Sequence, residues 1–123
     1  MRLWHEDLIG RLPAAQLLGQ HRECCALRGN GWGRKHSVVD YVFLHSPYKL
    51  FLYHQLIMEE MIRRGYHVSK EWKDKNYRGR SCEPYADLLE TEKTNPIYAE
   101  HDEAYLEECL LNLREKNIKI GGR

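Results

Sequence analysis

The segment SPYKLFLYHQLIMEEMIRRGY, residues 46–66, decides the fold because it carries a full set of helix signals. Ser46 can accept hydrogen bonds from the free amides at a helix N-terminus, and Pro47 suits the first helical position because its missing N–H would be unpaired there. The positive charges of Arg63 and Arg64 interact favourably with the negative C-terminal end of the helix dipole. Gly65 follows them and can adopt the left-handed conformation that ends a helix. Apolar side chains recur at helical spacing, at Leu50, Tyr53, Ile57 and Met61. The segment therefore predicts a long amphipathic helix.

The regions on either side of this segment predict two more helices. Residues 13–27 begin with Pro13 at a first helical position. The stripe expected to face the core there is Ala14, Leu17, Leu18, His21 and Cys25. Residues 96–116 follow Asn95 as the cap, with acidic side chains early and basic ones late, as the helix dipole favours. The side chains expected to share one side of that helix are Tyr98, Tyr105, Cys109 and Leu113.

The segments between the predicted helices favour loops over a sheet. Residues 37–44, SVVDYVFL, have strand-like composition, but the rest of the sequence offers no partner strand, so an extended or short helical segment is expected. Residues 28–36 hold three glycines and predict a loop, and residues 70–80 mix basic side chains with Trp72 and Tyr77. The expected fold is all-α, a compact single domain over residues 1–123, built on three main helices with long basic connecting loops.

The composition excludes several classes of protein. A chain of 123 residues fits one domain, and it contains no apolar run near the roughly 20 residues that a membrane helix needs. The four cysteines, Cys24, Cys25, Cys82 and Cys109, show no zinc or redox spacing, so reduced thiols in a cytoplasmic protein are expected. His36, His45 and His54 recur at intervals of nine, which matches no common ligand spacing, so no metal or other cofactor is predicted.

The net charge of +1 hides a strong division along the chain. Residues 1–82 carry 14 Lys or Arg against 8 Asp or Glu, a net of +6, whereas residues 83–123 carry 5 against 10, a net of −5. Lysine and arginine displace counterions from phosphate, glycine turns let the backbone approach it, and aromatic rings stack on unpaired bases. The basic part therefore suits a nucleic-acid partner. The alternative is a solvated loop region with Trp32 and Trp72 anchored in the core.

The N-terminus, MRLWHED, raises a separate question. Methionine aminopeptidases trim Met only before a small residue, so Arg2 predicts that Met1 is retained. The segment lacks the apolar run and cleavage site of a secretory signal. One interpretation is an ordinary N-terminal arm with Leu3 and Trp4 packed against the core. A cysteine nucleophile at Cys24 or Cys25 beside His21 is a further alternative, but no helix N-terminus is expected there to stabilise a thiolate.

Three short segments carry a resemblance to a known family. They are the N-terminal Met-Arg-Leu, QLLGQHRE at residues 16–23 and EEMIRRGYHV at residues 59–68. In order and spacing they resemble the pyrimidine-dimer DNA glycosylase and AP lyase family, of the T-even phage UV-repair endonuclease type. That family has an x-Arg-Ile start, a helix with an aromatic-Arg-Glu triplet and a later helix closing on Lys-Arg-Gly-aromatic. The chain departs from it with Gln16 for histidine, His21 for tyrosine and Ala26 for arginine, and it lacks the family's aromatic C-terminal tail.

The resemblance implies an all-α enzyme whose nucleophile is the free N-terminal α-amine, here that of Met1. An α-amine has a pKa of about 7.7 to 8.0, so an appreciable fraction is nucleophilic near neutral pH. It would attack C1′ of the target nucleotide and form a Schiff base, and Glu23 would serve as the acid and base of base excision and β-elimination. Arg2 and Arg22 would hold phosphates. Because the enzyme must reach the deoxyribose, it is expected to bend the duplex and extrude a base.

The resemblance and the basic loops together give an expected DNA surface. Arg28, Arg34 and Lys35 stand where they could replace phosphate contacts that the departures remove. The residues expected to contact DNA are Arg2, His21, Arg22, Arg28, Arg34, Lys35 and Arg63. The expected partner is double-stranded DNA with damaged pyrimidines or abasic sites, bound by a cytoplasmic, nucleoid-associated monomer with no membrane contact. The alternative is a non-catalytic nucleic-acid-binding module on the same scaffold.

Overall fold

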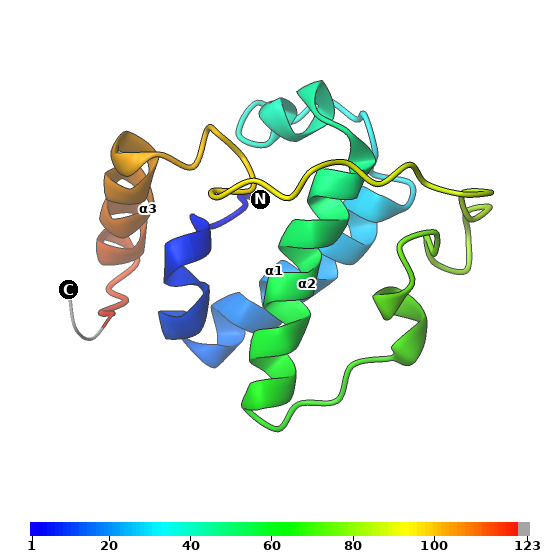
Figure 1. Ribbon diagram of the computed structural model, residues 1–123. Helices are drawn as coiled ribbons and strands as arrows, with labels where there is room; N and C mark the ends of the chain where they lie inside the picture. The colour runs from blue at the N-terminus through cyan, green and yellow to red at the C-terminus, as the bar shows by residue number, and fades with distance from the viewer. Residues whose placement is uncertain (121–123) are drawn as a thin grey trace.

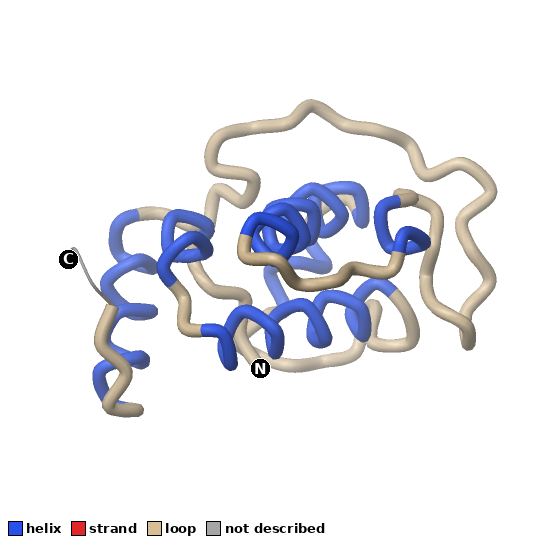
Figure 2. Tube along the Cα trace, turned by 90° about the horizontal axis from the view of Figure 1, so that it is seen from below, coloured by secondary structure: helices blue, strands red, loops and turns tan. Residues whose placement is uncertain are grey.

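The computed structural model describes residues 1–120 and contains helices but no strand in that part of the chain. Its elements are the 3-10 helix η1 (Glu6–Arg11), α1 (Ala14–Arg28), η2 (Asp40–Leu44), α2 (Pro47–Arg63), η3 (Lys70–Lys73) and α3 (Glu103–Glu115). Figure 1 shows α2 packed across α1, with η1 beside them and α3 at the outer edge. The view from below in Figure 2 shows the long loops that connect these helices around the outside. The expected all-α fold on three main helices is confirmed.

The signals of residues 46–66 act as the sequence predicts. The Ser46 hydroxyl accepts a hydrogen bond from the Tyr48 amide at 3.1 Å, and α2 begins at Pro47. At the other end, Gly65 adopts a φ of 89°, and the Tyr66 amide donates to the Met61 carbonyl at 2.9 Å. This pairing is the closing bond of a Schellman motif, which explains why the helix stops there.

The first helix forms where it is expected, but the predicted core-facing side was wrong. Pro13 is the N-cap of α1 and lies just outside the helix. The buried positions of α1 are Leu17, Gln20, Cys24, Leu27 and Arg28. Of the predicted stripe only Leu17 is buried, and His21 and Cys25 are half-buried. The pattern misled because two polar residues, Gln20 and Arg28, enter the interior, where each is held by hydrogen bonds.

The third helix begins at Glu103, seven residues later than predicted. Asp102 is its N-cap, since its carboxylate accepts from the Tyr105 amide at 2.9 Å. The preceding residues form an irregular segment that buries Ile97, Tyr98 and His101, and the Ile97 amide donates to the Glu6 carboxylate at 2.8 Å. Burial of these three side chains and the bond to Glu6 therefore hold the segment in an irregular conformation where a helix was predicted.

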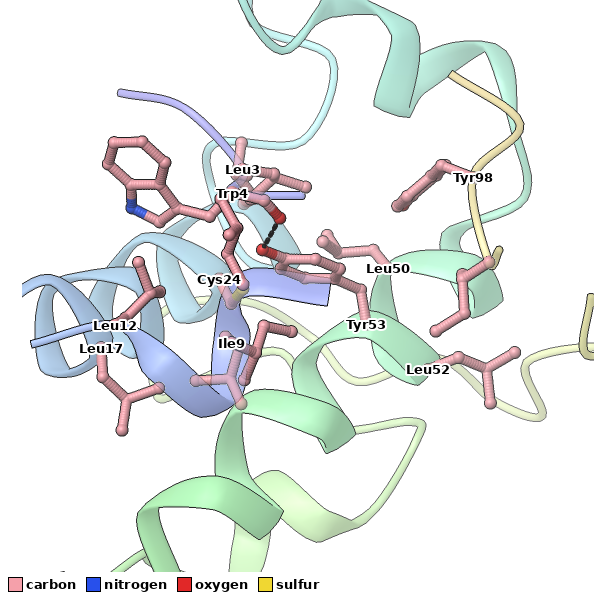
Figure 3. Close-up of a cluster of buried hydrophobic side chains, with 14 of the residues drawn as sticks. Leu3, Trp4, Ile9, Leu12, Leu17, Cys24, Leu50, Leu52, Tyr53 and Tyr98 are labelled. Atoms are coloured by element: carbon pink, nitrogen blue, oxygen red, sulfur yellow. Dashed lines mark hydrogen bonds between the residues drawn. The ribbon is translucent and has the colours of Figure 1, made fainter. Parts of the chain in front are cut away.

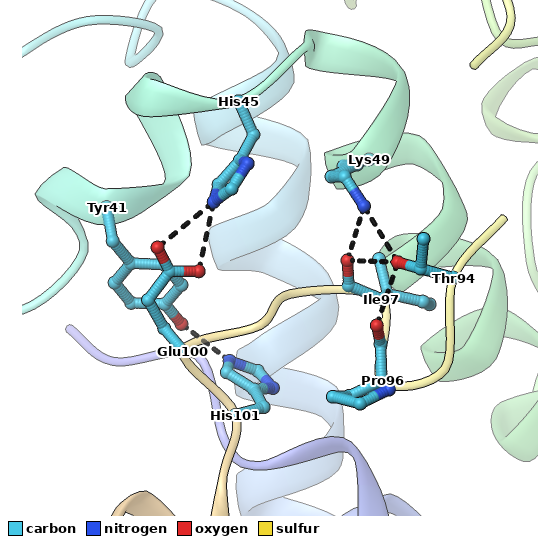
Figure 4. Close-up of polar contacts among 8 residues, drawn as sticks. All are labelled: Tyr41, His45, Lys49, Thr94, Pro96, Ile97, Glu100 and His101. Carbon is cyan, nitrogen blue, oxygen red and sulfur yellow. Dashed lines mark hydrogen bonds and ion pairs between the residues drawn. The ribbon is translucent and has the colours of Figure 1, made fainter. Parts of the chain in front are cut away.

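Polar contacts fix this segment, residues 94–101, against η2 and α2, as Figure 4 shows. Lys49 Nζ donates to the Ile97 carbonyl at 2.7 Å, and the His45 ring pairs with the Glu100 carboxylate at 2.9 Å. Residues 37–44, for which two conformations were open, form turns and the 3-10 helix η2. The segment is therefore short and helical.

The core lies between α1, α2 and the N-terminal arm, residues 1–5. Leu3 is fully buried and Trp4 is 6% exposed, so this arm packs inward as one interpretation of the sequence held. Figure 3 shows both residues in the cluster of buried side chains, with the Tyr53 hydroxyl donating to the Trp4 carbonyl at 2.6 Å. All four cysteines are free. Within residues 1–120, no helix is long and apolar enough to cross a membrane.

Candidate active site

A buried glutamine fixes the N-terminal arm onto α1. Gln20 is 1% exposed, and its amide nitrogen donates to the Arg2 carbonyl at 2.8 Å. Its amide oxygen accepts from the Trp4 backbone at 2.7 Å and from the Tyr53 hydroxyl at 2.8 Å. Every one of these bonds joins parts of the chain at least 16 residues apart. Gln20 therefore holds the arm at both Arg2 and Trp4.

The same glutamine reaches the candidate catalytic carboxylate. Gln20 Nε2 lies 3.1 Å from Glu23 Oε2, so the Gln20 amide donates to that half-buried carboxylate one helical turn further along α1. Burial raises the pKa of Glu23, and the N-terminal ammonium group, a backbone hydrogen bond from Arg2, and the Lys116 and Arg22 charges act in the opposite direction. Because Gln20 bonds both the Glu23 carboxylate and the Arg2 carbonyl, this carboxylate lies beside the N-terminal arm that begins at Met1.

Helix α3 completes the surroundings of the arm. The Arg2 guanidinium pairs with the Glu108 carboxylate at 3.3 Å and lies 5.9 Å from the centre of the Trp4 ring. The Tyr105 hydroxyl donates to the Leu3 carbonyl at 2.5 Å. Lys116 lies 5.4 Å from the centre of the Trp4 ring. Two cations therefore contact Trp4 near Glu23, although the part of the chain that supplies α3 is acidic.

A family model described as pyrimidine dimer DNA glycosylase matches residues 1–74. The chain belongs to this family. No curated protein and no solved structure matches it. Membership in the pyrimidine dimer DNA glycosylase family makes the protein a DNA repair glycosylase whose substrate is DNA with pyrimidine dimers. The match covers the N-terminal arm, α1, α2 and η3, whereas α3 lies outside it.

In this glycosylase the predicted DNA residue Arg28 does not lie on the surface. Arg28 is 5% exposed, and its guanidinium donates to the backbone carbonyls of Trp72 and Asp74 at 2.8 Å and of Tyr77 at 3.0 Å. It also stacks 5.0 Å from the centre of the Trp72 ring. Burial lowers the pKa of Arg28. The side chain therefore holds the loop after η3 against α1 and is not available to a phosphate.

Replacing this arginine should destabilise the fold. Arg28→Met keeps most of the buried volume but leaves three backbone carbonyls without their donors, and we expect the free energy of unfolding to fall by about 3 kcal/mol. Urea denaturation followed by circular dichroism measures the change. Arg114→Met, at an exposed position of α3, is the matched control and should stay within about 0.5 kcal/mol of the parent. If both variants unfold alike, the Arg28 bonds do not form in solution.

His21, Cys25 and His54 each place a potential metal ligand within 4.8 Å of the others. Arg28 Nη1 lies 3.0 Å from His54 Nδ1, and since a guanidinium can only donate, that nitrogen must accept. The proton of the neutral ring is then on Nε2, which donates to His21 Nδ1 at 2.8 Å. A metal ion would need the lone pair at that Nε2. Arg28 therefore opposes metal binding and makes the cluster a hydrogen-bonded link between α1 and α2.

The pKa shifts and contacts of this cluster bear on two candidate roles, that of Cys25 as a nucleophile and that of His21 as a DNA contact. Burial, followed by the nearby arginine charges, lowers the pKa of both His21 and His54, and burial raises the pKa of the Cys25 thiol to about 11. A protonated thiol is a poor nucleophile at neutral pH. The half-buried His21 ring has its Nδ1 engaged by His54, so that nitrogen is not free to contact DNA.

The remaining predicted DNA residues lie in different places. Arg22, Arg34 and Lys35 are exposed. Arg63 is exposed too, but it pairs with the Glu60 carboxylate at the C-terminal end of α2, in a surface hollow that also contains Glu6 and Glu59. Both Figure 1 and Figure 2 show that end of α2 away from the N-terminus. Arg63 is therefore not part of the region around Met1 and Glu23.

Sequence reasoning missed two residues of the site. Gln20 could have been noticed, because it is a polar side chain on the face that Leu17, Cys24 and Leu27 share at helical spacing. Lys116 could not have been found from the sequence, because only the packing of α3 beside the N-terminal arm brings it to Trp4 and Glu23.

Proposed function

We propose that this glycosylase excises a damaged pyrimidine and then cleaves the strand through a Schiff base of its Met1 α-amine, with Glu23 as acid and base. The observation that carries the proposal is that one buried side chain, Gln20, bonds both the Arg2 carbonyl in the N-terminal arm and the half-buried Glu23 carboxylate. Membership in the pyrimidine dimer DNA glycosylase family supports the choice of substrate. The substrates are double-stranded DNA with a cyclobutane-type dimer and DNA with an abasic site.

Excision begins when the unprotonated amine attacks C1′ of the damaged nucleotide. A C–N bond forms, the glycosidic bond breaks, and its electron pair leaves with the base, which takes up a proton. The positive charge that develops on the sugar is stabilised by a carboxylate beside it, and Glu23 supplies that carboxylate. Because Gln20 donates to one oxygen of Glu23, the carboxylate is held in place before the substrate arrives.

Strand cleavage follows through proton transfers at the same carboxyl group. Glu23 takes a proton from the new C1′-bound nitrogen and passes it to O4′ as the C1′–O4′ bond breaks, which leaves a protonated imine on Met1. A carboxyl with a raised pKa suits both transfers. Glu23 then removes a C2′ proton, the C3′–O bond breaks, and the phosphate leaves with its electrons. Water hydrolyses the imine and restores the amine.

Arg2 and Arg22 are the proposed phosphate contacts nearest to the chemistry. Arg2 belongs to the N-terminal arm and is only partly engaged by the exposed Glu108 carboxylate, a pairing of modest strength that a phosphate can replace. Arg22 is exposed next to Glu23, and within residues 1–120 it forms no ion pair. Arg34 and Lys35 extend the proposed surface. Arg28 is excluded from it by burial, and Arg63 is excluded because it lies at the C-terminal end of α2, away from the N-terminus (Figure 1).

Borohydride trapping tests this function directly. Protein whose first residue is verified as Met1 by mass spectrometry is incubated with an abasic duplex or a UV-irradiated duplex, and borohydride is added to reduce any imine. We expect a covalent adduct that maps to the N-terminal peptide, and none with undamaged duplex. Absence of an adduct with both damaged substrates would remove the Schiff-base mechanism and favour a module that binds DNA without cleaving it.

A further inference from the structure

A second basic surface lies beyond the residues around Met1. It is a groove of about 480 Å³ between the C-terminal turns of α1 and the loop after η3, and we refer to it as the basic groove. Arg34, Arg78 and Arg80 line it, together with Trp72 and glycine backbone, and none of the described residues that line it is acidic. Positive charges gathered without an acid are suited to an anion.

The loop side of the basic groove is fixed to the helix. Arg78 donates through Nε to the Arg28 carbonyl at 3.0 Å and through Nη2 to the Gly29 carbonyl at 3.3 Å. A Cβ atom at Gly29 would lie 2.7 Å from the Arg78 carbonyl oxygen, so only glycine allows the loop to approach so closely. Arg28 holds the same loop from inside through Trp72. These hydrogen bonds and the glycine together maintain the shape of the groove.

The other two arginines are free to bind a ligand. Arg34 and Arg80 are exposed, and neither forms an ion pair within residues 1–120. By contrast, Lys75 on the same loop pairs with Asp87 and Glu90 and so lies within reach of acidic side chains. Within the described part of the chain, Arg34 and Arg80 therefore bring two unpaired guanidinium groups to the basic groove.

The basic groove continues the surface that begins at Arg22. Arg22, Cys25, Ala26 and Gly29 follow the i, i+3, i+4, i+7 pattern of one helix face, and the last three line the groove. Ala26 lies four residues after Arg22, which is just over one helical turn, or about 6 Å along the axis. Ala26 is exposed and Gly29 has no side chain, so this face presents little bulk between Arg22 and the groove.

We propose that the basic groove binds the phosphodiester backbone of duplex DNA beside the damaged nucleotide, with Arg34 and Arg80 as the phosphate ligands. This inference rests on the proposed function, because it places the groove on the DNA whose deoxyribose reaches Met1. The family match ends at Asp74, whereas Arg78 and Arg80 follow it. Backbone contacts of this kind position DNA without reading its sequence.

The double variant Arg34→Ala/Arg80→Ala tests the groove. Its affinity for a duplex with a tetrahydrofuran abasic analogue, which cannot form a Schiff base, is measured at several salt concentrations. Each lost phosphate contact removes about 0.9 from the slope of log K against log salt, so we expect the slope to fall by about 2. Arg34→Lys/Arg80→Lys should keep the parent slope because it keeps both charges.

The matched control is Lys93→Ala/Arg114→Ala, which removes the same charge at exposed positions away from the basic groove. If its slope falls as far as that of the groove variant, only net charge matters and the groove is not a DNA site. An unchanged slope in the groove variant overturns the inference as well. Borohydride trapping of the parent separates this result from failure of the proposed function, since a missing groove contact leaves the adduct at Met1 intact.

Discussion

Acetylation of the Met1 α-amine is expected to abolish strand cleavage at an abasic site while DNA binding remains. An amide nitrogen has no available lone pair, so it cannot form the Schiff base on which β-elimination depends. Mildly acidic conditions direct the reaction to this amine, because α-amines titrate about 2 to 3 units below lysine side chains. Cleavage of a labelled abasic duplex and the intact mass of the protein are measured on the same sample.

Acetylation also removes a positive charge, and an extended variant controls for that loss. Adding one glycine before Met1 keeps the charge but moves the amine by up to about 3.6 Å, the length of one extended residue. Because Gln20 fixes the arm at Arg2, the added residue cannot be absorbed by sliding. We expect this variant to cleave at least about tenfold more slowly, since misplacement of a reacting group by about 1 Å can cost 100-fold. Full cleavage by the completely acetylated protein would assign the nucleophile to another group.

Glu23→Gln is expected to slow excision and strand cleavage by about a thousandfold, within the range for loss of a general acid or base. The amide oxygen of the substituted side chain can still accept the bond from Gln20, so the arm should keep its position and DNA binding should persist. Single-turnover rate constants on a dimer-containing duplex measure the effect. Glu107→Gln, at an exposed position of α3, is the matched control and should react at the parent rate. Unchanged excision by Glu23→Gln would show that this carboxylate has no chemical role.

The stability of Glu23→Gln gives a second readout with a definite sign. Because burial raises the pKa of Glu23, the folded protein holds this proton more tightly than the unfolded chain does. The favourable contribution of the protonated carboxyl is present below the ordinary pKa of 4.5 and is lost as pH rises through the raised value. At neutral pH the charged form opposes folding, so Glu23→Gln should be at least as stable as the parent. A marked loss of stability would indicate that the carboxylate has a structural role.

The fold was predictable where local signals decide it. The hydroxyl of Ser46 and the left-handed Gly65 set the ends of α2, because a cap and a C′ residue act within a few positions of the helix they bound. The start of α3 was not predictable, because Asn95 and Asp102 are both acceptable caps. Burial of Ile97, Tyr98 and His101 against distant parts of the chain selected Asp102.

The residues of the candidate site were also predictable only in part. The resemblance alone proposed Met1 and Glu23, and the structure adds that Gln20 links the N-terminal arm to Glu23. Sequence patterns assigned Arg28 the same weight as Arg34, since both are basic residues in or beside a glycine-rich loop. Only the positions of Trp72, Asp74 and Tyr77, 44 to 49 residues further along, made Arg28 a buried structural residue.

By itself, the sequence determined an all-α chain with a capped central helix, a basic N-terminal part and an acidic remainder, because these depend on composition and on contacts within one or two helical turns. Tertiary structure alone decided that Gln20 fixes the N-terminal arm and that Lys116 stands by Glu23. It also decided that the loop after η3 forms a groove with α1. Each of these depends on groups far apart along the chain, and their meeting is set by packing of the whole core, which no short segment encodes.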